Sequence, residues 1–270
     1  MSSNPQISSV HEDGEIITRR DGEVFVIGIN RPAKYNGFTP KMLKELAAAY
    51  TAFEQDAGAR VALLYAEGKH FTAGLDLPKV APFMGERNLL VDPGQIDPCN
   101  NVAPFRTKPV VAAVQGITYT LGIELMLAAD MVVAASDCRF SQLEVKRGIM
   151  ATGGATIRMV ERAGWGNAMR YLLTGDEFNC DVALRYGFIQ EVVAPGEQYA
   201  VAMDLCKRIA AQAPLAVSAT LRNARLAVED SPAAAVRDFH PTQKVLMASE
   251  DVKEGVASFV ERRAAAFKGR

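Results

Sequence analysis

The sequence feature that most restricts the fold is an almost uncharged stretch in the middle of the chain. Between Pro109 and Ala129 the only charged residue is Glu124. Glycines and polar residues interrupt this stretch, so it lacks the run of about 20 apolar residues that a membrane-spanning helix needs. Short Val-rich runs instead indicate strands covered on both faces. The stretch and its continuation therefore predict a buried strand at 110–114, a turn at 115–116, an apolar helix at 121–129 and a buried strand at 131–135.

The sequence on either side mixes further strand and helix patterns. Asp21-Gly22 separates two strand-like runs and predicts a hairpin turn, and Thr39-Pro40 predicts a helix start. Six prolines between residues 78 and 109 predict a long surface loop or lid. The other predicted strands are 15–20, 23–30, 60–66 and 189–193, and the other predicted helices are 153–162, 167–173, 181–186, 197–211, 215–228, a helix after Ser231-Pro232, and 251–266.

The order of these patterns predicts an α/β fold with an appended helical part. Strand and helix patterns alternate as far as about residue 195, and only helical patterns follow. We therefore expect a flexible tail at 1–12, an α/β core at 13–195 and a C-terminal helical subdomain at 196–270.

Charge and cysteine content narrow the classes of partner. The chain has 30 basic and 31 acidic residues, and this balance argues against binding to nucleic acid or to a membrane. The four cysteines, Cys99, Cys138, Cys180 and Cys206, have no metal-ligand spacing, so no metal site is expected. Free thiols and the absence of an apolar signal region predict a cytoplasmic protein.

Two glutamates are candidates for chemistry. Glu124 lies in a helix too apolar to have a solvent face, and burial would raise its pKa into the range useful for proton transfer. The sequence pattern around Glu124 is equally consistent with a structural glutamate that is hydrogen-bonded to an arginine or to backbone amides. Glu144 also has apolar neighbours, but Lys146 and Arg147 follow it, which favours a solvated surface residue.

Two loop-to-helix junctions could present free backbone N–H groups. They are residues 71–76, after a buried strand, and residues 115–122, which lead into the Glu124 helix. N–H groups at a helix start can stabilise an oxyanion, although tight turns without a ligand are commoner. His70 is interpreted as a loop residue and not as a catalytic base, and Trp165 as a packing anchor.

Several motifs in a fixed order resemble one family. They are Asn30–Asn36, Phe71–Leu77, Ala113–Gly116 with Gly122–Leu125 and Asp130, Phe140–Glu144 with Gly148–Gly154, and a C-terminal block from Ser249 to Arg263. Together they resemble the crotonase, or enoyl-CoA hydratase/isomerase, superfamily from about Gly22 to Arg270. The resemblance implies a spiral of repeated ββα units with C-terminal helices that assemble trimers, often paired as hexamers.

The resemblance also implies an activity and its residues. It implies an enoyl-CoA hydratase in which Glu124 and Glu144 form the catalytic pair and the backbone N–H groups of Leu75 and Leu121 form the oxyanion hole. Coenzyme A is the thioester carrier of the substrate, with no prosthetic group and no metal. The residues implied to bind coenzyme A are Lys34, Ala73, Leu75, Asp76 and Leu77, with Phe259 and Arg262 reaching the coenzyme A of a neighbouring subunit.

Other activities on the same fold stay open. The alternatives are an enoyl-CoA isomerase, a thioester or C–C hydrolase, and an acyl-CoA-binding protein without catalysis. Four departures from the family pattern bear on this choice: Thr120-Leu121 replace two glycines, Pro78 replaces a lysine, and Leu143 and Ala151 replace prolines. Leu121 is expected to narrow the acyl pocket or to redirect the N–H donor.

Overall fold

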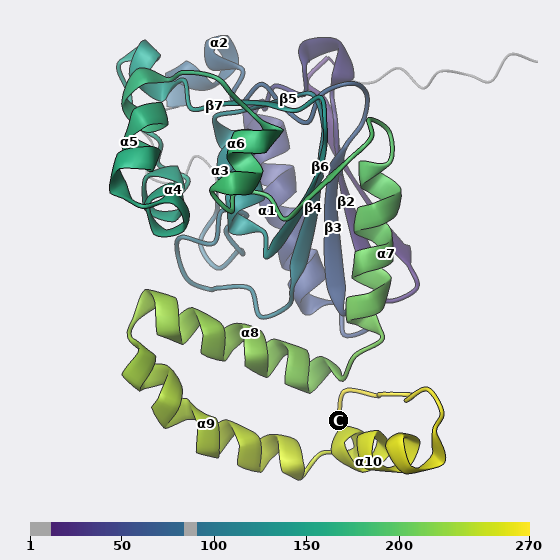
Figure 1. Cartoon of the computed structure of the whole chain (residues 1–270). Coiled ribbons are helices and arrows are strands. Elements are labelled where there is room, and N and C mark those ends of the chain that lie inside the picture. Colours follow the sequence, from purple (N-terminus) through teal and green to yellow (C-terminus); the bar gives the residue numbers. More distant parts are fainter. Residues whose placement is uncertain (1–11, 84–90) are drawn as a thin grey trace, which may run out of the picture.

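The computed structural model describes residues 12–83 and 91–270 of the chain. The predicted tail at 1–12 therefore lies outside the described residues except for its last residue, and so does the 84–90 part of the proline-rich segment. The described chain forms a mixed α/β core, and the last three helices lie below it at one end (Figure 1). None of the described helices combines the length and the apolar character that crossing a membrane would require.

A six-stranded sheet forms the centre of the core. Its first two strands are an antiparallel hairpin, and the remaining neighbours are parallel. The order is β1 (Glu15–Asp21), β2 (Val24–Asn30), β3 (Val61–Ala66), β4 (Val110–Val114), β6 (Met131–Ala135) and β9 (Glu191–Val193). The hairpin turn is one residue later than predicted: Asp21 pairs with Val24, so Gly22 and Glu23 form the turn. Gly22 takes φ 59° there, a conformation that glycine adopts without strain.

Alternate residues of these strands pack into two apolar layers. Helices α1 (Pro40–Gln55) and α3 (Leu121–Ala128) contribute to the larger layer. Helix α7 (Gln198–Ala210) covers the other face, where it packs on Val26, Leu63 and Val111. This two-sided burial explains the near-continuous apolar runs in the sequence. Helix α1 begins as predicted, with the Thr39 hydroxyl accepting a hydrogen bond from the Met42 N–H.

A second, three-stranded sheet lies beside the first and was not predicted. Its order is β5 (Ile117–Tyr119), β7 (Arg139–Ser141) and β8 (Phe178–Asn179). β4 of the large sheet is followed by β5 of the small sheet, and β6 of the large sheet is followed by β7 of the small sheet. The chain thus repeats the same unit twice, with one strand in each sheet. This arrangement confirms the predicted α/β class and its repeated units. The new strands have two or three residues each, too few to show a periodic pattern.

The proline-rich segment is only partly the surface loop that the sequence predicted: residues 81–83, 92–94 and 102–105 are exposed, but others are not. It begins with the short helices α2 (Leu77–Val80) and η2 (Ala81–Phe83), and residues 96–100 are buried. The Asp97 carboxylate accepts hydrogen bonds from the backbone N–H groups of Cys99 at 2.9 Å and Asn101 at 2.8 Å. A turn whose polar groups are satisfied internally can be buried at little cost, which proline counting does not reveal.

The remaining helices follow the predicted order. They are η1 (Pro32–Lys34), η3 (Glu144–Arg147), α4 (Ala155–Ala163), α5 (Trp165–Thr174), α6 (Cys180–Arg185), α8 (Pro214–Glu229), α9 (Pro232–Met247) and α10 (Glu250–Glu261). The helix predicted at 251–266 ends early, because the chain reverses at Arg262 with φ 54°. The Arg270 carbonyl then accepts hydrogen bonds from the backbone N–H groups of Glu250 and Asp251. Trp165 is 72% exposed and is not the predicted packing anchor of this chain.

The position of α7 bears on the domain boundary. The predicted boundary after residue 195 separates α7 from the sheet that it covers. Helices α8, α9 and α10 instead form a layer of their own below the core (Figure 1). We therefore propose that the helical subdomain begins after α7.

A buried ionic cluster ties the core to this subdomain. The Arg106 guanidinium donates to the Asp130 carboxylate at 2.7 and 3.0 Å. Arg225, on α8, donates to the Arg106 carbonyl at 2.7 Å and to Asp130 at 3.3 Å. Burial alone would raise the pKa of Asp130, but the Arg106 charge and the hydrogen bonds outweigh it and lower that pKa.

Replacing Arg106 should destabilise the protein strongly, because it leaves the Asp130 carboxylate buried without its main partner. Breaking a buried ion pair from one side costs about 3–5 kcal/mol, so Arg106→Leu should lower the free energy of unfolding by about that amount. Arg222, on α8, is a matched control: its own side chain is 60% exposed where it pairs with Asp238, and Arg222→Leu should cost no more than about 1 kcal/mol. Urea unfolding followed by circular dichroism measures both, and equal losses would contradict the role of burial.

Candidate active site

The two predicted loop-to-helix junctions lie against each other. The Thr72 N–H donates to the Ile117 carbonyl at 3.1 Å, and the Tyr119 N–H donates to the Thr72 carbonyl at 3.0 Å. Further along, a Cβ added at Gly74 would lie 1.7 Å from the Thr120 hydroxyl. Only glycine allows the two loops to approach so closely, and this contact brings Leu75 near Leu121.

Both junctions present a free backbone N–H. Leu121 is the first residue of α3, where an N–H has no acceptor within the helix. Among the described residues, neither the Leu75 N–H nor the Leu121 N–H donates a hydrogen bond. Their neighbours are engaged, since Gly74 donates to Thr72 and Asp76 donates to Phe38. The two N–H groups are therefore available to an oxygen atom of a ligand.

The residue before α3 has a strained backbone. Thr120 has φ 49° and ψ −115°, a conformation that β-branched residues rarely adopt and that costs on the order of 1–3 kcal/mol. Its carbonyl accepts hydrogen bonds from Ile123 and Glu124, and its own N–H donates to the Ser141 carbonyl at 2.9 Å. These contacts hold the turn in place and set the direction of the Leu121 N–H.

Glu124 is buried within α3, as predicted. Its side chain is 5% exposed, and one carboxylate oxygen accepts a hydrogen bond from the Ala155 N–H at 3.3 Å. Burial and the nearby Glu144 charge raise its pKa to about 7, against the opposing effect of the Ala155 and Gly153 N–H groups. Glu124 thus changes protonation state near neutral pH.

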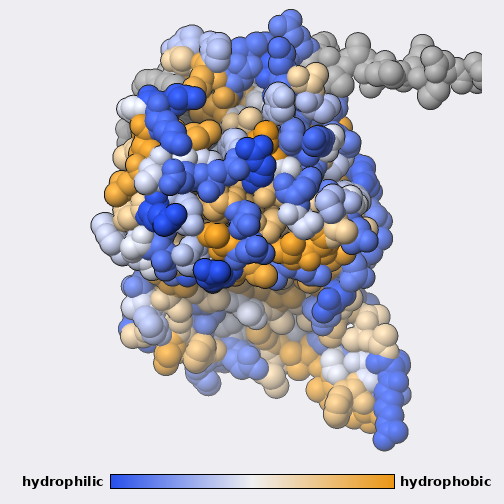
Figure 2. Space-filling model, turned by 45° about the horizontal axis from the view of Figure 1, so that its top comes forward, coloured by the Kyte–Doolittle hydropathy of each residue, from blue (hydrophilic) through white to orange (hydrophobic). Residues whose placement is uncertain are grey.

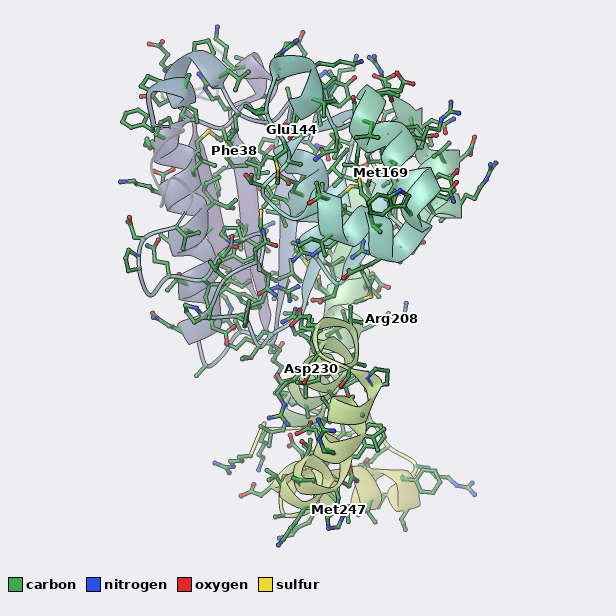
Figure 3. The ribbon with its side chains drawn as sticks, turned by 90° about the vertical axis from the view of Figure 1, so that its left-hand side faces the viewer. Phe38, Glu144, Met169, Arg208, Asp230 and Met247 are labelled. Atoms are coloured by element: carbon green, nitrogen blue, oxygen red, sulfur yellow. The ribbon has the colours of Figure 1, made fainter. Side chains whose placement is uncertain are left out.

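Glu144 lies at the start of η3, directly after β7, and at the same end of the core as Phe38 (Figure 3). It is half-buried, and one of its carboxylate oxygens is buried without a hydrogen-bond partner among the described residues. Burial raises its pKa. The interpretation of Glu144 as a solvated surface residue is therefore wrong for its carboxylate, although Lys146 and Arg147 beside it are exposed.

Sequence reasoning did not identify the residues that hold Glu124. A Cβ added at Gly153 would lie 2.5 Å from the Glu124 carboxylate, so glycine is required there for space. Arg158 donates to the carbonyls of Gly153 and Asn100, both at 3.3 Å, and so joins the buried turn to this loop. The pair Gly153-Gly154 was visible in the sequence, but only as a helix start.

The loop implied to bind coenzyme A is joined to the loop that contains Lys34. The Ala73 N–H donates to the Tyr35 carbonyl at 2.9 Å, and the Arg31 guanidinium donates to the Asp76 carboxylate at 2.7 Å. Lys34 is exposed on η1. The structure thus brings Lys34 together with Ala73, Leu75, Asp76 and Leu77, but the Asp76 carboxylate is already bonded to Arg31.

Two implied site residues lie elsewhere. Phe259, which is 85% exposed, and Arg262 belong to the end of α10. In Figure 1 this helix lies at the opposite end of the molecule from α2 and β5. Within one chain they do not join the other candidate residues. His70 is a structural loop residue, since its Nδ1 accepts a hydrogen bond from the Ile117 N–H at 3.1 Å.

Comparisons with known proteins converge on one family. A family model described as enoyl-CoA hydratase/isomerase matches residues 19–270. The chain is 30% identical to 2,3-dehydroadipyl-CoA hydratase of Escherichia coli (strain K12), covering 95% of this chain and 99% of that one. It is 32% identical to (E)-benzylidenesuccinyl-CoA hydratase of Thauera aromatica, covering 91% and 96% of the two chains.

A solved structure shows the same fold. The crystal structure of a probable enoyl-CoA hydratase/isomerase from Mycobacterium abscessus is 50% identical and superposes with a TM-score of 0.91, covering 94% of this chain and 98% of that one. The two curated relatives share the word hydratase in their names but differ in the acyl group named.

The raised pKa of Glu124 predicts a pH-dependent stability. The folded protein binds the Glu124 proton more tightly than the unfolded chain, so this group lowers stability as the pH rises from about 4.5 through about 7. Glu124→Gln removes the penalty, and its free energy of unfolding should rise relative to the parent protein by about 3 kcal/mol between pH 5 and pH 8. Urea unfolding at several pH values measures this. Glu161→Gln, at an exposed position of α4, is the control and should show the same pH dependence of the free energy of unfolding as the parent protein. The same pH dependence in Glu124→Gln would contradict the raised pKa of Glu124.

Proposed function

The chain belongs to the enoyl-CoA hydratase/isomerase family, and from this we propose that it is a hydratase that adds water across the double bond of a 2-enoyl-CoA thioester. The observation that supports this best is the juxtaposition of two charge-coupled glutamates with two free N–H donors. The two glutamates suit proton transfer, and the two N–H donors suit a carbonyl oxygen that gains negative charge.

The thioester carbonyl oxygen would accept hydrogen bonds from the Leu75 and Leu121 N–H groups. When water adds to C3, negative charge moves onto this oxygen, and the two donors stabilise it more in the transition state than in the ground state. Loss of one such donor typically costs on the order of 10²–10³ in rate. The dipole of α3 adds to the effect, because Leu121 begins that helix.

Glu124 and Glu144 would move the protons. Burial and the Glu144 charge raise the pKa of Glu124 to about 7, so Glu124 can hold a proton near neutral pH. The ionised member accepts a proton from the attacking water, whose hydroxyl bonds to C3, while the protonated member gives its proton to C2. Water is thereby added in full, and the pair again holds one proton.

Coenzyme A would be held by the joined loops that contain Lys34 and residues 73–77. In our proposal, Phe259 and Arg262 contact the coenzyme A of a neighbouring subunit in a trimer or a hexamer. Exposed apolar residues on the last helices support such an assembly. They include Phe239, Val245, Met247, Val256 and Val260, and Figure 2 shows hydrophobic surface on the lower part of the molecule.

Two other activities would use the same oxyanion donors. An isomerase would move the double bond, and a hydrolase would release free coenzyme A. The curated hydratase names favour hydration, and mass spectrometry of the product separates the three, because only hydration adds water and keeps the thioester. Tight binding of enoyl-CoA thioesters without any product would instead indicate an acyl-CoA-binding protein.

Replacing either glutamate should abolish most of the hydration. General acid–base groups contribute about 10²–10⁴ in rate, so Glu124→Gln and Glu144→Gln should each lower kcat on crotonyl-CoA by about that factor. The loss of absorbance of the conjugated enoyl thioester measures it. Glu161→Gln is the matched control and should keep parental kcat, whereas parental kcat in Glu124→Gln or Glu144→Gln would refute the role of that residue.

Leu121 should limit the acyl chain. Its neighbours Leu43, Leu46, Pro98, Cys99 and Leu125 line a cavity of only about 10 Å³, room for no more than about one water. Leu121→Ala should raise kcat/KM for a long enoyl-CoA relative to crotonyl-CoA by roughly tenfold or more. Steady-state kinetics over a series of chain lengths tests this, and an unchanged ratio would show that Leu121 does not line the acyl site.

A further inference from the structure

Two cysteines that the proposed reaction does not use face each other across the small sheet. β7 and β8 are antiparallel, with Arg139 opposite Asn179 and Phe140 opposite Phe178. The same register, extended by one residue beyond the ladder to the point where β8 ends and α6 begins, places Cys138 opposite Cys180. Opposed residues of antiparallel strands have Cα atoms about 4.5–5.5 Å apart, within the range of about 4.4–6.8 Å that a disulfide spans.

The two cysteines also share a hydrogen-bond acceptor. Cys138 and Cys180 are free thiols, both buried, at 2% and 5% exposure, and the backbone N–H of Cys138 donates to the Ala135 carbonyl at 3.0 Å. The Cys180 thiol also donates to the Ala135 carbonyl at 3.3 Å. The strand register and the shared Ala135 carbonyl therefore bring the two cysteines together.

The two thiols differ in reactivity. The neighbouring Cys138 side chain lowers the pKa of Cys180, while the Cys180 side chain and burial raise the pKa of Cys138. Cys180 is thus the sulfur that more readily becomes the nucleophilic thiolate. It begins the short helix α6, between the exposed residues Asn179 and Asp181, so only one residue separates it from the surface in either direction along the chain.

We propose that Cys138 and Cys180 are a reversible oxidation site that closes to a disulfide with a small peroxide. The Cys180 thiolate attacks hydrogen peroxide, breaks its O–O bond and becomes a sulfenic acid, releasing hydroxide. The Cys138 sulfur then attacks the Cys180 sulfur and displaces the second oxygen as water. Two thiols lose two electrons and two protons in total, and the peroxide is reduced to two waters.

The disulfide would fasten the strand that leads to Glu144. Cys138 immediately precedes β7, and Glu144 follows the end of that strand. The bond would close a loop from residue 138 to residue 180 that contains Glu144 and the Gly153 loop beside Glu124. Closing a loop of this length restricts the unfolded chain and raises the melting temperature.

The chain provides its own control. Cys99 and Cys206 are equally buried, but neither has a cysteine among the neighbours that shift its pKa. The test treats the folded full-length protein with hydrogen peroxide, removes the peroxide, unfolds the protein in the presence of N-ethylmaleimide and maps the peptides by mass spectrometry. We expect an intramolecular peptide pair joining Cys138 to Cys180 that dithiothreitol releases, with Cys99 and Cys206 alkylated.

Two further measurements complete the test. Oxidation should raise the melting temperature of the parent protein by roughly 5–10 °C, and Cys138→Ala should abolish this shift and leave Cys180 as a sulfenic acid that a dimedone probe captures. The proposal would be overturned if both cysteines were alkylated after peroxide treatment, or if they were over-oxidised without forming a disulfide. A disulfide to Cys99, to Cys206 or to a second chain would also overturn it. The peptide map of the parent protein decides the matter even if the variant does not fold.

Discussion

The structure of the candidate site depends on one constraint: α3 is an apolar helix without a solvent face, so protein groups must satisfy its polar atoms. All of its residues are buried. At its C-terminal end, Arg106 donates to the Ala128 carbonyl at 2.8 Å and Arg162 donates to the Leu127 carbonyl at 2.7 Å. These two cations also complement the negative end of the helix dipole. At the N-terminal end the Leu121 N–H has no such partner, and this difference between the ends makes the start of α3 the place for a ligand oxygen.

The small sheet explains how the other groups reach the same place. β5 leads into Thr120 and α3, and β7 leads into Glu144. The isolated bridge between Thr72 and Thr118 adds the loop that ends at Leu75. The segments that follow Thr72, β5 and β7 therefore all begin at the same end of the small sheet. This brings Leu75, Leu121 and Glu144 to one place, although they are far apart in sequence. The loop at Gly153 contacts the Glu124 carboxylate, which accepts a hydrogen bond from the Ala155 N–H at 3.3 Å.

Much of this arrangement could be predicted from the sequence, but its small elements could not. Strands β4 and β6 follow from apolar runs of five residues, and the cap of α1 follows from Thr39-Pro40. β5 and β7 have three residues each, so no periodicity marks them. The burial of Glu124 could be predicted from its apolar helix. The burial of Glu144 could not, because Lys146 and Arg147 in the same short helix η3 are exposed while one Glu144 carboxylate oxygen is buried. Family motifs, and not local physics, pointed to Glu144.

The distribution of charge gives a reason for the proposed assembly. Coenzyme A is strongly anionic, but the chain has 30 basic and 31 acidic residues and cannot attract it by net charge. The cation beside the candidate loop is engaged, because Arg31 is bonded to Asp76. Lys34 is exposed beside the candidate loop. Under the proposed function, the remaining positive charge and an aromatic surface for the adenine would come from Arg262 and Phe259, which lie too far along the molecule to serve their own chain. A second copy that presents its α10 to this loop would satisfy both requirements, so assembly and ligand binding would depend on each other.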